Sequence, residues 1–319
     1  MPHDRFFNIV FSRKEHARDL VLNSLPDMVI RVLDLESIEV SKESFVDQKL
    51  ASRQSDILIR TRFRGSSVLI YVLVEHKSYP YRWTVFQLLK YMVRIWEKEL
   101  AQNTGMVKLP LIIPLIFYHG SRKWRFPLDF SFYFDQPQEL EPYIPDFKAH
   151  LYNLQEIDDR DIRGHVTYQA ALKTMKHVVR NLKPYLREIL ADLSGLPFDE
   201  ETRSFLSVLF RYILQEGKGT ETEDLERELK ASNFKKAGEV YMTIAEKLEE
   251  EGIKKGKIEG EIQEKQQVLL RLLEKKFGLK DVEKEKILNT RDRIELDRAI
   301  DLLLDAKTTA DVLKLLASA

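Results

Sequence analysis

The sequence predicts an α/β fold with a helical C-terminal extension, and three neighbouring segments carry this prediction. Residues 54–64 alternate between apolar and basic side chains, the period-2 pattern of a half-buried strand. Residues 68–74 form a continuous apolar run rich in β-branched side chains, which is typical of a strand buried on both faces. Residues 82–100 then place apolar side chains at helical spacing.

The rest of the chain predicts further helices and one more strand. Residues 5–33 have helical spacing interrupted at Pro26, residues 109–118 resemble a buried strand, and residues 120–150 look irregular. Helical spacing resumes over residues 158–215, and again over the highly charged residues 225–276. The chain therefore divides into a main domain of residues 1–215, a charged helical linker of residues 216–278 and a small helical tail domain of residues 279–319.

Composition narrows the class of protein. The 319 residues contain 51 Lys and Arg, 51 Asp and Glu and no cysteine, which excludes disulfides, thiolate zinc sites and cysteine nucleophiles. Residues 51–100, however, contain nine basic and four acidic residues, so a local phosphate-binding surface is compatible with a chain of zero net charge. The most apolar stretch, Leu109–Tyr118, is shorter than the roughly 20 residues of a spanning helix. We expect a soluble, cytoplasmic protein without a membrane segment.

The register of the first hairpin brings two acidic residues together. If Gly65 and Ser66 form a two-residue type II′ turn, paired residue numbers sum to 131 and Asp56 lies opposite Glu75. Opposed side chains have Cβ atoms about 5 Å apart, and two carboxylates at that distance repel each other unless a cation lies between them. Hard oxygen ligands of this kind suit Mg²⁺, or alternatively Mn²⁺.

Lys77 lies two residues after Glu75 and therefore projects from the same face of its strand. Asp56, Glu75 and Lys77 would surround one point, where the carboxylates hold a metal and the lysine orients water or steadies charge. This set suits phosphodiester hydrolysis. Arg60, Arg62 and Arg64 fall on the Asp56 face and would extend a phosphate-contacting surface.

Several motifs in order resemble one family. The segments are HDRFFNIVFSRKEHARDLVLNSLP, SDILIR, VLVEHKS, FQLLKYMVRIWE and LPLIIPLIFYHG followed by a tryptophan. They resemble the Rpn recombination-promoting nucleases, also labelled transposases, within the PD-(D/E)XK nuclease superfamily. The resemblance covers roughly residues 3–215. It implies a restriction-endonuclease-like core, in which a central mixed sheet is flanked by helices, and a DNA endonuclease activity linked to recombination or mobile elements.

The same resemblance assigns roles to individual residues. It implies Asp56 and Glu75 as metal ligands, the backbone carbonyl of His76 as a further ligand, and Lys77 as the catalytic lysine. Gln87 and Tyr91 are similar to the Q-x-x-x-Y motif of RecB-like nucleases and share one helix face. Two positions depart from the patterns. Ser55 replaces the proline before the first acid, and Lys77 stands where many family members have glutamine, which favours retained activity.

Other interpretations remain open at this point. The acids and lysine could form an ordinary polar strand end, and the chain could be a strict transposase or an inactive, partner-regulated DNA-binding protein. Glu15 is an alternative acid for the metal site. The His3-Asp4 pair suggests a metal phosphohydrolase only weakly, because no other histidine has matching spacing, and His119 fits a structural hydrogen bond better than a place in the active site.

Tyr91 and Trp96 could stack on bases, although Trp96 fits apolar packing better. Gly252, Gly256 and Gly260 recur every four residues, which allows a close-packed homodimer through the helix at 225–276.

Overall fold

The computed structural model describes residues 2–41, 56–135, 138–220, 222–232 and 234–316, which form two compact units. Unit 1 contains residues 1–244 and unit 2 contains residues 245–319. The domain boundaries expected after residues 215 and 278 stay predictions about how the chain is organised.

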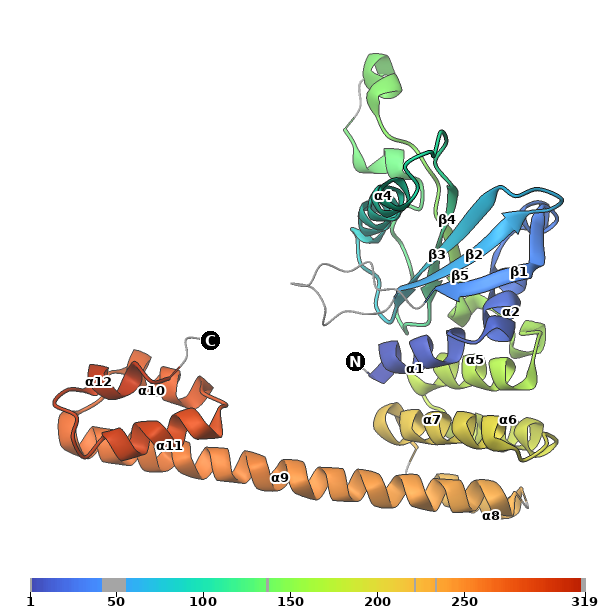
Figure 1. The fold of residues 1–319 in the computed structure, drawn as a ribbon. Helices are drawn as coiled ribbons and strands as arrows, with labels where there is room; N and C mark the ends of the chain where they lie inside the picture. The colour runs from blue at the N-terminus through green and yellow to red at the C-terminus, as the bar shows by residue number, and fades with distance from the viewer. Residues whose placement is uncertain (1, 42–55, 136–137, 221, 233, 317–319) are drawn as a thin grey trace. The chain divides into compact units, whose positions relative to one another are not determined.

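Unit 1 is built on a five-stranded mixed sheet with the order β1-β2-β3-β4-β5. β1 pairs antiparallel with β2 and β2 pairs antiparallel with β3, whereas β3 pairs parallel with β4 and β4 pairs parallel with β5. The parallel step from β3 to β4 is made by helix α4, Thr84–Gln102 (Figure 1). The strands are β1 Leu33–Ser41, β2 Asp56–Phe63, β3 Leu69–Lys77, β4 Leu111–Tyr118 and β5 His150–Asn153. The α/β class is therefore confirmed.

The register predicted for the hairpin of β2 and β3 is confirmed, although its turn differs. Asp56 pairs with Glu75 through the backbone ladder. The predicted two-residue type II′ turn is wrong. Phe63 N–H donates to the carbonyl of Val68, which leaves a four-residue loop of residues 64–67, and within it Ser66 N–H donates to the carbonyl of Phe63. Gly65 occupies the third position of that turn with φ of 73°, a conformation that glycine adopts without steric cost. The predicted loop of residues 65–66 and the observed loop of residues 64–67 have the same midpoint. The numbers of paired residues therefore still sum to 131.

Helices cover both faces of the sheet (Figure 1). On one face α4 buries Leu88, Met92 and Ile95 against side chains of β2, β3 and β4, including Leu58 and Leu73. On the other face lie α1 Pro2–Phe11, α2 Lys14–Ser24 and α5 Val166–Val178. The strand β3 is buried from Ile70 to His76, as its continuous apolar run predicts.

The remaining helices of unit 1 form short connections and further layers. The helix expected over residues 5–33 is divided into α1, α2 and α3, and residue 33 already begins β1. In the described residues of the irregular stretch at 120–150 there are two 3₁₀ turns. The bounds are α3 Asp27–Ile30, η2 Phe130–Tyr133, η3 Gln138–Tyr143, η4 Leu154–Glu156, η5 Asp159–Asp161, η6 Lys183–Tyr185, α6 Leu186–Ser194, α7 Glu200–Glu216 and α8 Thr222–Ala231.

Helix α9, Lys235–Phe277, begins in unit 1 and continues into unit 2. Residues 249–260 are exposed on every side of this helix. A Cβ atom added at Gly252, Gly256 or Gly260 would meet nothing within 4 Å. The three glycines therefore contact no other part of the described chain, and the expected homodimer through this helix stays a prediction.

Unit 2 has its own apolar core. Leu269 and Leu273 of α9 are buried against Ile287, Leu296 and Val312, which come from three short helices. These helices are α10 Asp281–Asn289, α11 Arg293–Leu302 and α12 Thr309–Leu313. Across both units, no helix in the described part of the chain is long and apolar enough to cross a membrane.

Candidate active site

The centre of the candidate site is a buried carboxylate on β3. The side chain of Glu75 has no solvent-exposed surface, and neither of its carboxylate oxygens accepts a hydrogen bond from a described residue. Among the described side chains, its one ion pair is with Lys77, whose Nζ lies 2.5 Å from Oε1. The angles at this contact do not fit a hydrogen bond, so we treat the contact as an ion pair. Buried polar oxygens are normally hydrogen-bonded. Because no described residue donates a hydrogen bond to the two Glu75 oxygens, both keep the capacity to bind a cation.

A chain of hydrogen bonds holds Lys77 against α4. Lys77 Nζ donates to Gln87 Oε1 over 3.2 Å, and Gln87 Nε2 donates to the Tyr91 hydroxyl over 2.7 Å. Gln87 and Tyr91 are four residues apart, which places both on the side of α4 that faces the sheet. Four of the residues expected in the site, Glu75, Lys77, Gln87 and Tyr91, therefore lie together, and their catalytic roles stay predictions.

The two other acids considered for this site differ in their positions. Asp56 begins β2 as the register partner of Glu75, and its side chain lies outside the described residues. Glu15 is exposed on α2, which covers the opposite face of the sheet from α4, so the fold does not bring it to Glu75. Among the described residues, no three His, Asp or Glu side chains are arranged to hold a metal ion.

A second buried carboxylate on the α4 face provides a contrast. Glu99 Oε1 accepts a hydrogen bond from the Tyr71 hydroxyl at 2.6 Å, and Asn103 Nδ2 donates to Oε2 at 3.2 Å. Arg60, expected to contact phosphate, has its guanidinium 3.6 Å from this carboxylate and 5.4 Å from the Tyr71 ring centre. Burial and the hydrogen bond to Glu99 raise the pKa of Tyr71 to about 12. Within the described part of the chain, Glu99 thus accepts hydrogen bonds from Tyr71 and Asn103, whereas Glu75 has only its ion pair with Lys77.

The His76 side chain points away from Glu75, because neighbouring residues on a strand face opposite sides of the sheet. Its ring stacks on Phe7 of α1 with ring centres 4.5 Å apart, and its Nδ1 lies 3.0 Å from Asp4 Oδ1. Burial lowers the pKa of His76 and outweighs the opposing effect of Asp4. The His76 side chain therefore takes no part in the site around Glu75, and its backbone carbonyl as a metal ligand stays a prediction.

The fold assembles a histidine cluster that the sequence does not reveal. His3, His76 and His119 are in ring contact, with centres 5.0 Å apart for His3 and His119 and 4.9 Å apart for His76 and His119. Burial lowers the pKa of His3 to about 4, and it lowers that of His119 strongly. His119 Nδ1 contacts the carbonyl of Met175 at 3.2 Å, which agrees with the structural role expected for this residue. No spacing along the chain signals this contact, because the three residues come from α1, the end of β3 and the end of β4.

Comparisons with known proteins identify the family to which the chain is similar. The family described as "Putative transposase, YhgA-like" matches residues 1–203. Three proteins of Escherichia coli strain K12 are each 28% identical to the chain. Recombination-promoting nuclease RpnA matches 79% of this chain and 84% of its own length, and recombination-promoting nuclease RpnC matches 95% and 98%. The third, named inactive recombination-promoting nuclease-like protein RpnE, matches 93% and 96%. No solved structure matches.

The family match covers well over half of the chain, and the curated relatives extend through most of the remainder. The chain therefore belongs to the YhgA-like transposase family, the family of the Rpn recombination-promoting nucleases.

Proposed function

We propose that this protein is a metal-dependent endonuclease that hydrolyses phosphodiester bonds of DNA in the cytoplasm, in recombination or in the biology of mobile elements. One observation carries the proposal. Glu75 is fully buried beside Lys77, accepts no hydrogen bond from the described residues, and pairs in register with Asp56. Relatives named as nucleases support a nuclease activity. The mixed sheet with helices on both faces is compatible with a restriction-endonuclease-like core.

The chemistry of the residues fits a hard divalent cation. Carboxylate oxygens of Asp56 and Glu75, with the backbone carbonyl of His76, are the ligand types that Mg²⁺ and Mn²⁺ prefer. A buried carboxylate that lacks hydrogen-bond donors is costly unless a charge compensates it, and Lys77 contacts only one of the two oxygens. When bound, such a cation would polarise the scissile phosphate and lower the pKa of a coordinated water.

Lys77 supplies a fixed positive charge beside the carboxylate. Its Nζ contacts both Glu75 and Gln87, and Tyr91 in turn orients the Gln87 amide. An ammonium group that is already held in one orientation, like that of Lys77, stabilises negative charge on a phosphate without reorganisation during the reaction. The Lys77 side chain is about one-tenth exposed, so a DNA strand that approaches the site can reach its Nζ. This position supports the role that we propose for Lys77, which is to orient the attacking water or to steady the developing charge.

A second candidate is a DNA-binding or interaction protein that has lost activity or depends on a partner. The name of RpnE, which matches 93% of this chain, favours this candidate. The two proposals differ in what Glu75 and Lys77 do, because a protein that only binds DNA does not require a metal at this carboxylate.

Cleavage of supercoiled plasmid by the purified full-length protein separates the two proposals. The reactions contain Mg²⁺, Mn²⁺ or a chelator, beside an Asp56→Ala variant. We expect metal-dependent nicking or linearisation that the variant lacks. DNA binding without cleavage under either metal would support the second candidate, and cleavage that survives Asp56→Ala would place the active site elsewhere.

A further inference from the structure

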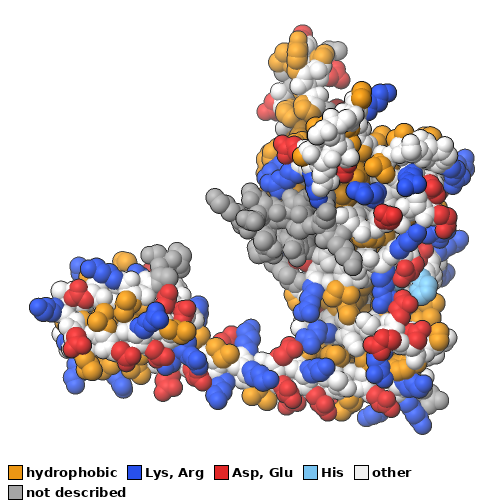
Figure 2. All heavy atoms as spheres, viewed as in Figure 1, with side chains coloured by type: hydrophobic (Ala, Val, Ile, Leu, Met, Phe, Trp, Pro, Cys, Tyr) orange, Lys and Arg blue, Asp and Glu red, His pale blue; other side chains and the backbone are white. Residues whose placement is uncertain are grey.

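Exposed aromatic side chains gather where β3 leads into α4. Tyr79, Tyr81, Trp83 and Phe86 are 52%, 42%, 45% and 45% exposed. Large apolar groups that gather on a surface usually mark an interaction site. Figure 2 shows hydrophobic side chains beside Lys and Arg side chains over the α4 part of the molecule. We call residues 79–86 the aromatic surface.

The aromatic surface begins at the candidate active site. The Tyr81 ring centre is 6.0 Å from Lys77 Nζ, and Phe86 directly precedes Gln87, which accepts a hydrogen bond from the same lysine. A group that lies on the Tyr81 ring is therefore next to Lys77.

Two rings of the aromatic surface pack against rings of η2, Phe130–Tyr133. Phe86 stacks on the buried ring of Phe130, with ring centres 6.4 Å apart and planes 11° apart. The Trp83 ring centre is 5.7 Å from that of Tyr133, whose hydroxyl donates to the carbonyl of Arg82 over 2.7 Å. Rings held in this way bind a flat partner at a low cost in conformational entropy.

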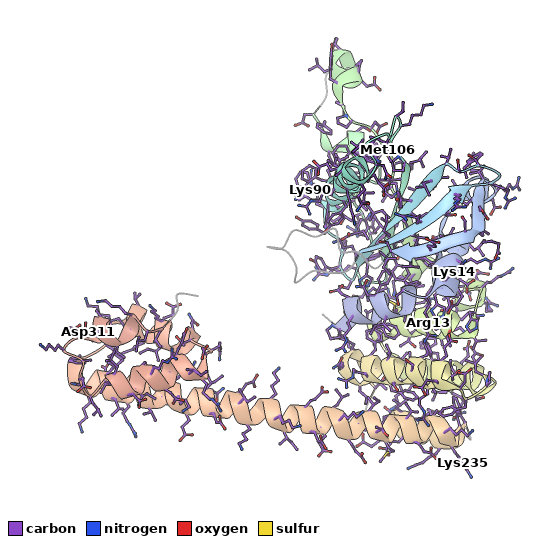
Figure 3. The ribbon with its side chains drawn as sticks, in the orientation of Figure 1. Arg13, Lys14, Lys90, Met106, Lys235 and Asp311 are labelled. Carbon is purple, nitrogen blue, oxygen red and sulfur yellow. The ribbon has the colours of Figure 1, made fainter. Side chains whose placement is uncertain are left out.

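Cations accompany the rings. The Arg82 guanidinium carbon lies 5.6 Å from the Trp83 ring centre, and Lys90 is exposed one helical turn after Phe86 (Figure 3). Alternating cations and aromatic faces fit phosphates and bases along one nucleic-acid strand, with Arg adding to the stacking. A purely apolar protein partner would gain nothing from these charges.

We propose that the aromatic surface stacks the bases of an unpaired stretch of DNA next to the scissile phosphate, so that the preferred substrate is single-stranded or locally unpaired DNA. This inference rests on the proposed nuclease function. In an intact duplex the base faces are covered by their neighbours, and a protein meets only phosphates and groove edges. Exposed ring faces gain binding energy only from bases that have left the stack.

Binding of a labelled oligonucleotide to the full-length protein tests the proposal. Fluorescence anisotropy is measured in chelator, so that nothing is cleaved, with one sequence as a single strand and as a duplex. Stacking on one ring predicts that Trp83→Ala weakens single-strand binding about 5- to 100-fold and duplex binding far less. Trp83→Phe keeps a stacking ring and should bind almost like the wild type. Phe63→Ala is the matched control, because Phe63 is 44% exposed at the far end of β2 and should change nothing.

Intrinsic fluorescence gives an independent readout. Trp83 is the most exposed tryptophan of three, so the single strand should quench the wild type and not Trp83→Phe. Unchanged single-strand binding by both Trp83→Ala and Tyr81→Ala would overturn the proposal. So would a loss of self-association in these variants without any loss of DNA binding, because the surface would then be a protein interface. Plasmid cleavage by the same preparations separates the two failures. Cleavage with ring-independent binding refutes only the stacking, and ring-dependent binding without cleavage under either metal refutes only the nuclease.

Discussion

Replacing Glu75 with glutamine should remove the stabilisation of the fold by divalent cations. The substitution keeps the shape of the side chain and removes its charge. Both Glu75 oxygens are buried and lack hydrogen bonds from the described residues, a condition that costs about 1–3 kcal/mol for each unsatisfied group. A cation that binds there would relieve this cost only in the folded protein. We therefore expect Mg²⁺ or Mn²⁺ to stabilise the wild type and not Glu75→Gln.

The size of this effect follows from mass action. At a metal concentration about 100 times the dissociation constant, binding to one site adds about 2.7 kcal/mol to the free energy of unfolding. For a unit of this size, 1 kcal/mol corresponds to about 2–4 °C in Tm, so the expected shift is about 5–10 °C. The assay is thermal unfolding followed by circular dichroism, with Mg²⁺, with Mn²⁺ and with chelator.

Glu99→Gln is the matched control for this assay. Glu99 is also a buried carboxylate on the α4 face, but Tyr71 and Asn103 donate hydrogen bonds to it. We expect Glu99→Gln to lower Tm in chelator, since it weakens these bonds and the contact with Arg60, and to keep the full shift caused by metal. A shift of equal size in Glu75→Gln would refute the assignment of Glu75 as a metal ligand.

Three further predictions concern positioning, pH and packing. Gln87→Leu removes the acceptor that fixes Lys77, so we expect plasmid cleavage to slow roughly 10- to 100-fold while the Tm shift caused by metal remains; an unchanged rate would show that Lys77 needs no such support. Burial lowers the pKa of His3 to about 4, below its unfolded value near 6.5, so the unfolded chain binds more protons between these values. The free energy of unfolding should therefore be unaffected by His3 above about pH 6.5 and should fall as pH falls toward 4, by roughly 3 kcal/mol at most. Denaturant unfolding of the wild type and of His3→Asn across this pH range would measure the contribution of His3. Phe7 is fully buried against His76, so Phe7→Ala should cost about 3–5 kcal/mol in urea unfolding, and a cost below about 1 kcal/mol would contradict this packing.

The sequence predicts the elements around the site because their signals are local. The alternation in β2, the apolar run of β3 and the helical spacing of α4 each lie within one short window. The pairing of Asp56 with Glu75 depends only on where the hairpin is centred, so it survives the error in the turn. The contact between Lys77 and Gln87 follows because α4 begins only seven residues after β3 ends.

The elements that the sequence did not predict lack such local signals. β1 contains acidic residues and a register shift between Asp34 and Glu39, which disturbs its alternation. The helical spacing predicted over residues 5–33 therefore wrongly includes Leu33, the first residue of this strand. β5 has only four residues and is defined by its pairing with β4. The contact of His3 with His119 joins residues that are far apart in the chain, and only the fold brings them together.

Single-turnover cleavage of DNA by the wild type, Glu75→Gln and Glu99→Gln, with Mg²⁺ and with chelator, tests most directly whether Glu75 holds a catalytic metal. The wild type and Glu99→Gln should cleave only with Mg²⁺, whereas Glu75→Gln should be slower by about 100-fold or more, because the metal loses a charged ligand. Cleavage by Glu75→Gln at the wild-type rate, or cleavage by the wild type in chelator, would contradict a metal centre at this carboxylate.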